Sequence, residues 1–120
     1  MPKILVVDDD PNVRDLLADL LALEGHDVHV ARSGTEALAA ITNDRPDCVV
    51  LDIMMPGMSG HEVLANVRRD DGGAMLPVVM LSAAAEEDQA WRAWTGGVDY
   101  FLPKPFDTDY LLQCLDQLAS

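Results

Sequence analysis

Short apolar runs alternate with amphipathic stretches along the whole chain. The runs KILVVD at 3–8, DCVVLD at 47–52 and LPVVMLS at 76–82 are apolar through their middles. Runs of about four to eight such residues, rich in β-branched side chains, are typical of strands buried on both faces. The weaker runs HDVHVA at 26–31 and VDYFL at 98–102 complete a set of five predicted strands.

Helical spacing of leucine, valine and alanine fills the segments between these runs. Asp10 is a favourable N-cap for the first helix, Pro11 suits its first turn, and Gly25 is predicted to end it. Serine and glutamate three residues apart, at Ser33–Glu36 and Ser59–Glu62, form capping boxes for two more helices. These two helices are expected to run to about residues 42 and 69. Two further helices are expected over 85–95 and after residue 107.

The predicted order is therefore strand then helix, five times over. Near-continuous apolar strands separated by helices indicate a parallel sheet that is covered on both faces. The fold class expected is α/β, with a doubly wound five-stranded parallel sheet in a single domain over residues 1–120. An eight-fold barrel is excluded because it needs about 250 residues.

Composition and charge narrow the possible functions. The net charge of −13 makes this segment a poor ligand for nucleic acid or for an anionic membrane surface. No apolar run has the length of a membrane span or the pattern of a signal peptide, so a cytoplasmic location is expected. Cys48 and Cys114 have no metal-binding spacing and are predicted to be buried thiols in a reducing compartment.

Polar side chains follow four of the predicted strands where each strand ends. Asp8 and Asp9 follow the first strand, Asp52 ends the third, Ser82 ends the fourth, and Lys104 follows the fifth. Ligands of open parallel sheets bind beyond the carboxyl ends of the strands. We therefore expect these side chains to converge on one pocket if the first and third strands are neighbours.

Three carboxylates in one pocket repel one another unless a cation compensates them. Oxygen ligands in a partly open site suit Mg²⁺, and a lysine and a hydroxyl would stabilise the oxygens of a transferring phosphoryl group. An aspartate can accept that group covalently. Taken singly, the acidic run could be only an N-cap, Ser82 a turn residue and Lys104 a surface charge. The chain contains no GxxxxGK[ST] or GxGxxG loop.

The segments ILVVDDDPNVR, VVLDIMMPGMSGHEVL, PVVMLSA and FLPKPF together resemble the receiver domain of two-component response regulators. The resemblance covers nearly the whole chain. It implies a CheY-like, flavodoxin-like sheet in the order 2-1-3-4-5. It also implies that Asp52 accepts a phosphoryl group from a sensor histidine kinase or phosphotransfer protein, catalysed only by the domain's own residues. The domain would then regulate an unknown output partner or domain.

The same resemblance implies roles for the other site residues. Asp8, Asp9, Asp52 and the backbone carbonyl of Met54 would hold Mg²⁺, with Asp9 a direct ligand and Asp8 acting mainly through water. Ser82 would be the switch hydroxyl and Lys104 the site lysine.

Beyond the pocket, Phe101 would be the aromatic switch residue on a face built from the fourth helix, fifth strand and fifth helix. Tyr100, beside it, should point the other way. Trp91 and Trp94 lie three residues apart, so both cannot easily be deep in the core. Either one packs inward while the other shields a helix edge, or the two form a surface for a partner together with Tyr100. Pro105 is expected to follow a cis peptide bond.

Several alternatives stay open at this point. A phosphorylation-independent interaction module of the same fold is disfavoured by the intact set of Asp9, Asp52, Ser82 and Lys104. An aspartate-nucleophile phosphohydrolase is disfavoured because Met54 breaks the expected DxD pattern. A phosphorylation-dependent homodimer is open, although the last helix lacks a basic end. Whether the chain is a stand-alone regulator or the receiver of a longer protein is also open. The three histidines are expected on the surface: His26, His29 and His61.

Overall fold

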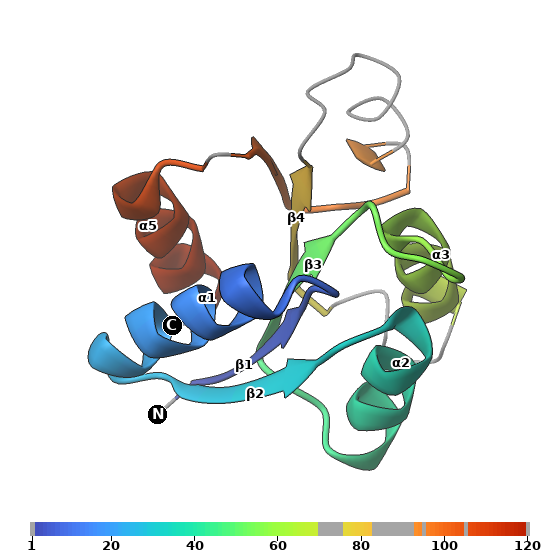
Figure 1. Cartoon of the computed structure of the whole chain (residues 1–120), viewed down its shortest axis with the longest axis horizontal. Helices are drawn as coiled ribbons and strands as arrows, with labels where there is room; N and C mark the ends of the chain where they lie inside the picture. Colours follow the sequence, from blue (N-terminus) through green and yellow to red (C-terminus); the bar gives the residue numbers. More distant parts are fainter. Residues whose placement is uncertain (1, 70–75, 83–92, 95, 105, 120) are drawn as a thin grey trace.

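Helices cover both faces of a central sheet in the computed structural model (Figure 1). The structure describes residues 2–69, 76–82, 93–94, 96–104 and 106–119. The strands are β1 Lys3–Val7, β2 Asp27–Ala31, β3 Cys48–Asp52, β4 Val78–Ser82 and β5 Tyr100–Pro103. Among the described residues, the helices are α1 Pro11–Leu23, α2 Gly34–Asn43, α3 Gly60–Arg69 and α5 Thr108–Ala119.

The five strands are all parallel and lie in the order β2-β1-β3-β4-β5. Because β1 and β3 are neighbours, the ends of these two strands meet at the centre of the sheet. The register pairs Val7 of β1 with Leu51 of β3, so Asp8 and Asp52 each come one residue later on adjacent strands. The predicted fold class and strand order are confirmed.

The predicted helix starts are visible as hydrogen bonds. Asp10 caps α1 by accepting from the backbone amide of Asn12 at 2.9 Å. The capping box of α3 is complete, since Ser59 Oγ accepts from the Glu62 amide at 3.3 Å and Glu62 Oε2 accepts from the Ser59 amide at 3.0 Å. Gly25 ends α1 with φ of 87°, a value that L side chains rarely adopt.

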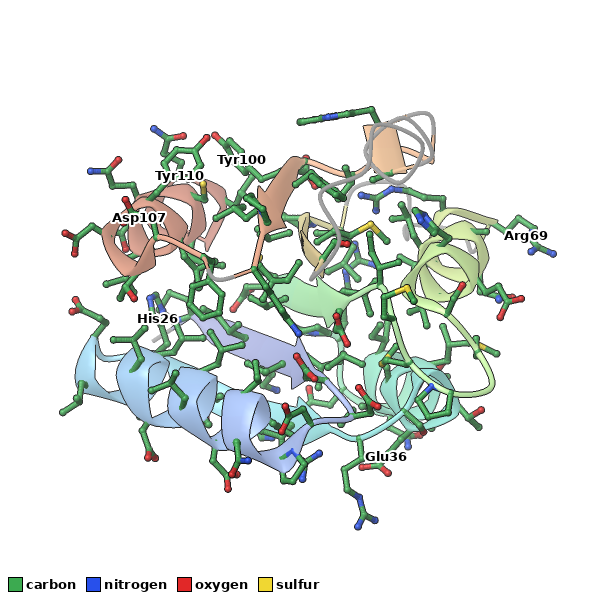
Figure 2. The ribbon with its side chains drawn as sticks, turned by 45° about the horizontal axis from the view of Figure 1, so that its top comes forward. His26, Glu36, Arg69, Tyr100, Asp107 and Tyr110 are labelled. Atoms are coloured by element: carbon green, nitrogen blue, oxygen red, sulfur yellow. The ribbon has the colours of Figure 1, made fainter. Side chains whose placement is uncertain are left out.

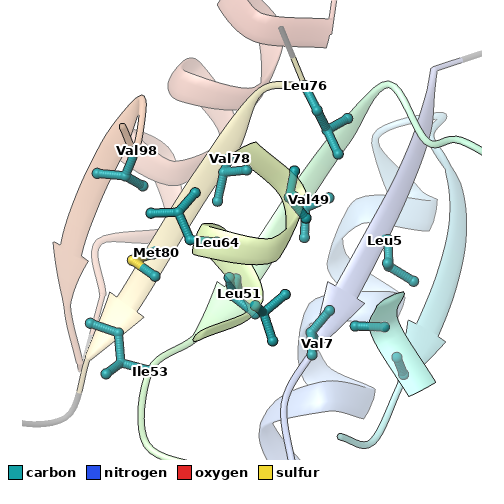
Figure 3. Packing of buried hydrophobic residues seen from close by; sticks show 14 of the residues in the cluster. Leu5, Val7, Val49, Leu51, Ile53, Leu64, Leu76, Val78, Met80 and Val98 are labelled. Atoms are coloured by element: carbon teal, nitrogen blue, oxygen red, sulfur yellow. The ribbon is translucent and has the colours of Figure 1, made fainter. Parts of the chain in front are cut away.

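Two buried apolar clusters lie on opposite faces of the sheet. Alternate residues of the strands join α2 and α3 in one cluster, which Figure 3 shows around Leu51, Leu64 and Met80. The other alternate residues join α1 and α5, through side chains such as Leu17 and Leu111. This two-sided burial explains why the central strands are apolar at nearly every position. Cys48 and Cys114 are free and buried, as predicted.

The differences from the expected elements are small and concentrate at strand ends. β5 begins at Tyr100 rather than residue 98, because Val98 still hydrogen-bonds back to Ala93 as part of the preceding turn. The helix expected over 85–95 lies mostly outside the described residues. Within this segment the structure describes Ala93 and Trp94, and both are helical. Within the part of the chain that the structure describes, no helix is long and apolar enough to cross a membrane.

Candidate functional site

A buried polar cluster occupies the carboxyl end of the sheet. Asp8, Asp52 and Ser82 are 1%, 3% and 0% exposed, and they are the buried polar side chains among the described residues. Asp52 and Ser82 end β3 and β4, while Asp8 follows β1 directly. The structure thus brings the carboxylates of Asp8 and Asp52 together at this edge, and Ser82 lies at the end of the adjacent strand β4.

Lys104 joins the two buried carboxylates. Its Nζ donates to Asp8 Oδ2 at 2.9 Å and to Asp52 Oδ1 at 3.2 Å. The Lys104 backbone amide also donates to the Ser82 carbonyl at 2.6 Å, which ties the β5 end to the β4 end. The lysine is thus held in place through its main chain while its ammonium group reaches across the sheet.

Asp8 is held by hydrogen bonds to its side chain, its backbone amide and its backbone carbonyl. Its Oδ1 accepts from the Asp10 amide at 2.9 Å, and its own amide donates to the Ala31 carbonyl at 3.2 Å. Arg14, in the first turns of α1, donates from Nη1 to the Asp8 carbonyl at 3.0 Å. These bonds leave Oδ2 to face Lys104, so the carboxylate has a defined direction.

The electrostatics of the cluster are set by burial and by like charge. Burial, followed by the charge of Asp8, raises the pKa of Asp52 to about 6, although Lys104 opposes both effects. Burial alone would lower the pKa of Lys104, but its bonds to Asp8 and Asp52 outweigh burial, so the pKa is raised. Lys104 therefore stays charged at neutral pH. Asp52 changes its charge near pH 6, slightly below neutral pH.

Three carboxylates could hold a cation at this site. Oxygen atoms of Asp8, Asp9 and Asp52 lie within 4.8 Å of one another, and Asp9 is the exposed member. An all-oxygen set with one open side fits Mg²⁺, which retains several water ligands. One lysine compensates only part of this negative charge, so the donor set matches a divalent cation in charge as well as in chemistry.

Gly60 packs against the main chain of Asp52 and Ile53. A Cβ atom on Gly60 would lie 2.5 Å from the Asp52 carbonyl oxygen and 2.8 Å from Ile53 Cα. The Gly60 amide donates to the Ile53 carbonyl at 2.9 Å. The loop between β3 and α3 can therefore fold tightly over the end of β3 only with glycine at this position.

The two neighbouring aromatic residues of β5 point to opposite faces, as expected. Phe101 packs against the cluster under α2 and α3, and Tyr100 packs against the cluster under α5. Trp94 is 53% exposed. Trp91 and Pro105 lie outside the described residues, so the expected aromatic surface is seen only in part and the expected cis bond is not described.

The histidines depart in part from the prediction. His29 is exposed, whereas His26 and His61 are half-buried. Both ring nitrogens of His26 are shielded from solvent and accept or donate no hydrogen bond within the described residues. The short spacing between Gly25 and β2 pulls His26 inward, since its amide bonds back to the Leu21 carbonyl.

Two residues that support the site were not singled out from sequence. Arg14 acts on a backbone carbonyl six residues earlier, and no side-chain pattern marks such a contact. Gly60 follows the cap Ser59 and could be read as an ordinary first-turn residue. The signal that could have found Gly60 is glycine in a helix start, where Ser59 already supplies the cap and glycine is otherwise unfavourable.

Comparison with known proteins places the chain beside signalling regulators. The family profile described as "Response regulator receiver domain" matches residues 4–116. Response regulator MprA of Mycobacterium sp. (strain KMS) is 44% identical over 110 residues, covering 92% of this chain and 47% of that protein. The protein described as "DNA-binding dual master transcriptional regulator RpaA", of Synechocystis sp. (strain ATCC 27184 / PCC 6803 / Kazusa), is 38% identical over 112 residues, covering 93% and 46%.

Solved structures agree along nearly the full chain. Vibrio cholerae chemotaxis protein CheY4 superposes with a TM-score of 0.92 at 31% identity and 98% coverage of both chains. The receiver domain of the Francisella response regulator 1452 gives a TM-score of 0.91 at 33% identity, covering 99% of this chain and 97% of that one. The chain spans about half the length of the curated relatives described above.

Proposed function

Because this chain belongs to the family of response regulator receiver domains, we propose that Asp52 is its phosphoacceptor in a Mg²⁺-dependent signalling switch. The observation that carries the proposal is the contact of Lys104 with both Asp8 and Asp52 at the carboxyl ends of adjacent strands. This arrangement combines a carboxylate nucleophile with a fixed positive charge at a water-accessible edge.

The transfer follows from the positions of these groups. An ionised oxygen of Asp52 attacks the phosphorus of a phosphohistidine on a sensor kinase, or of a small acyl phosphate. The new oxygen–phosphorus bond forms as the bond to the donor breaks, and a leaving histidine nitrogen takes a proton from solvent. The product is an acyl phosphate on Asp52, which water later hydrolyses back to the carboxylate.

Five other residues of this chain would assist Asp52. Lys104 Nζ donates to the phosphoryl oxygens, and the Ser82 hydroxyl binds them from the end of β4. Asp8 and Asp9, with Asp52 and the backbone carbonyl of Met54, would hold Mg²⁺. When bound, the cation would neutralise the negative charge that develops on the transferring oxygens.

The pKa of Asp52 sets the pH range in which its carboxylate is ionised and can act as a nucleophile. With a pKa of about 6, about nine-tenths of Asp52 is ionised at pH 7 in the absence of metal. In the metal-free protein, the ionised fraction of Asp52 falls as the pH drops through 6. A bound cation would lower this pKa and shift the decline to more acidic pH.

A groove beside Lys104 could bind the phosphodonor protein. An apolar groove lined by Val13, Leu16, Lys104, Phe106 and Thr108 separates the start of α1 from the start of α5. Leu16 is 61% exposed in this groove and would supply apolar contact area to a bound protein. We assign this groove to the donor protein, a sensor histidine kinase or phosphotransfer protein.

The test is the intact mass of the protein after incubation with acetyl phosphate and Mg²⁺. One added phosphoryl group is expected for the wild type, and none for Asp52→Ala or in the presence of a chelator. Asp19→Asn, a change of an exposed carboxylate on α1, is the matched control and should form the adduct normally. No adduct on the wild type would indicate a phosphorylation-independent module, and turnover of external phosphoesters would indicate a phosphohydrolase.

A further inference from the structure

A cavity of about 150 Å³ lies between the sheet and the last turn of α2. Its apolar lining comes from Leu5 of β1, Ala40 of α2 and Pro46, which precedes β3. Leu5 is 2% exposed and Pro46 is buried, so this lining is held by the core. Lys3 borders the cavity five residues before Asp8, which places about 16 Å of strand between Lys3 and the acidic site. The cavity is therefore separate from the proposed phosphoacceptor site.

Carboxylates outnumber cationic groups in the contacts at the border of the cavity. Lys3 is the one lysine or arginine among the lining residues. Its Nζ pairs with Asp44 Oδ2, and its backbone amide donates to Asp47 Oδ2 at 2.7 Å. His29, a further lining residue, contacts Asp27 Oδ2 through Nε2 at 3.4 Å. Because three carboxylates face at most two cations in these contacts, they carry net negative charge whether or not the histidine is protonated.

The end of α2 adds to the negative potential at this border. The helix ends at Asn43, and its last turn contains no basic side chain. The carbonyl end of a helix carries partial negative charge and attracts cations. The side chain of Asp44 is 69% exposed, so its carboxylate can accept from a ligand while it stays paired with Lys3. A cation at this border is therefore attracted both by the carboxylate and by the helix end.

We propose that the cavity binds a small organic amine, with a ring or a branched alkyl group inside and the ammonium group against Asp44. An apolar cavity of about 150 Å³ holds one benzene-sized group, so the ligand has about seven to ten non-hydrogen atoms. The ammonium group stays at the exposed border and keeps part of its hydration. The amine would be a small-molecule input to the chain that does not depend on the proposed phosphorylation of Asp52.

Other classes of ligand fit the cavity less well. An anion would have to compete with Asp44 for Lys3 and would meet the negative end of α2. A metal ion is not indicated, because the group of three possible ligands among the described residues is Asp8, Asp9 and Asp52. Pockets for drug-sized ligands have volumes of about 300 to 1,000 Å³, so a nucleotide or another large ligand is too big.

The probe is benzylamine, and benzyl alcohol and benzoate are its uncharged and anionic analogues of similar shape. Binding to the full chain is followed by amide chemical shifts in nuclear magnetic resonance spectra. Benzylamine should shift the signals of Leu5, His29 and Ala40 with a dissociation constant of about 1 mM, as expected for so small a ligand. Benzyl alcohol should bind about threefold more weakly, and benzoate should shift none of these signals.

Two pairs of variants separate the cavity and its charge from general effects. Ala40→Leu fills the cavity and should weaken benzylamine binding about tenfold or more, whereas Ala39→Leu adds the same group to an exposed position of α2 and should change binding less than about twofold. Asp44→Asn removes the carboxylate and should weaken binding about threefold. Glu36→Gln removes a carboxylate at the other end of α2, where Figure 2 shows Glu36 at the periphery of the molecule, and should change binding less than about twofold.

Four results would overturn the proposal. Absence of shifts at the lining residues, or equal binding to wild type and Asp44→Asn, would exclude an amine held by this carboxylate. Benzoate that binds as tightly as benzylamine would make the cavity a site for anions, and equal binding of benzyl alcohol would reduce it to an apolar cavity. If circular dichroism shows that Ala40→Leu does not fold, the comparison of Asp44→Asn with Glu36→Gln decides, since both side chains are exposed. The mass adduct on Asp52 should form normally in Asp44→Asn, so failure of amine binding and failure of phosphorylation are distinguishable.

Discussion

Replacing Asp52 by asparagine should stabilise the metal-free protein at neutral pH, although it removes the proposed acceptor. The wild-type carboxylate is 3% exposed, and burial beside Asp8 raises its pKa from 3.8 to about 6. A folded-state pKa above the unfolded value means that the folded protein prefers the protonated form. The stabilising contribution of Asp52 is therefore complete below pH 3.8 and is lost as the pH rises through 6.

The size of the effect follows from this shift. Two pKa units correspond to about 3 kcal/mol of free energy at neutral pH. Solvent enters the pocket on the side of Asp9, so screening reduces this to about 1 to 2 kcal/mol. Asparagine keeps the shape of the side chain and an oxygen that accepts from Lys104, but it carries no charge. The variant should thus be more stable than the wild type by about that amount at pH 7.5.

Urea unfolding monitored by circular dichroism, with chelator present, measures the difference. Between pH 5 and pH 7.5 the advantage of Asp52→Asn should grow by about 0.5 to 1.5 kcal/mol, because the wild type ionises in that interval. Asp19→Asn replaces an exposed carboxylate on α1 and should give a difference that hardly changes with pH. Adding Mg²⁺ should then stabilise the wild type more than Asp52→Asn, by RT ln(1 + [Mg²⁺]/Kd) for each protein.

The reasoning would be refuted by a difference that is independent of pH between 5 and 7.5, or by a variant less stable than the wild type at pH 7.5. Either result would mean that Asp52 ionises in the folded protein at no cost. The attraction of Lys104 would then outweigh the effect of burial on the pKa of Asp52, whereas the structure indicates that burial has the larger effect. An equal response to Mg²⁺ would place the cation elsewhere.

Other substitutions test the remaining parts of the site. Lys104→Met should slow adduct formation from acetyl phosphate about a hundredfold or more, because the fixed charge that stabilises the transferring oxygens is lost; mass spectrometry over time measures this, and an unchanged rate would remove Lys104 from the reaction. Gly60→Ala should lower the free energy of unfolding by about 1 to 3 kcal/mol in urea, since the new methyl group collides with the Asp52 carbonyl, and a stable variant would contradict the tight loop. Met54→Asn should shorten the lifetime of the acyl phosphate, because an amide can hold the attacking water that Met54, 58% exposed and apolar, cannot; radiolabel loss measures it, and a longer lifetime would refute the idea.

Much of the fold follows from the spacing of apolar residues. The central runs are apolar up to their last residue because both faces of β3 and β4 are covered, and this pattern distinguishes a parallel sheet from an antiparallel one. Helix starts are equally well marked, since Asp10 and Ser59 bond to the backbone amides that the sequence predicts. Strand ends are less certain because the bonds that define them come from distant residues, as in the bond from the Asp99 amide to the Val78 carbonyl.

The site could be predicted as a set of residues but not as a geometry. The positions of Asp8, Asp52 and Lys104 at strand ends follow from the sequence, because parallel strands share one carboxyl edge. The bridging of two carboxylates by Lys104 depends on strand order, which periodicity alone leaves open. Contacts to the main chain, such as that of Arg14 with the Asp8 carbonyl, have no sequence pattern at all.

The charge imbalance at this edge connects stability with signalling. One lysine faces three carboxylates, so the metal-free site is destabilised and the pKa of Asp52 is raised. The same imbalance would favour binding of a divalent cation, because the cation would offset the repulsion between the three carboxylates that remains in the folded protein. A chain selected only for stability would replace Asp52 by a neutral residue at the end of β3. The proposed phosphoacceptor role needs the carboxylate despite this cost, because only the ionised side chain can form the acyl phosphate.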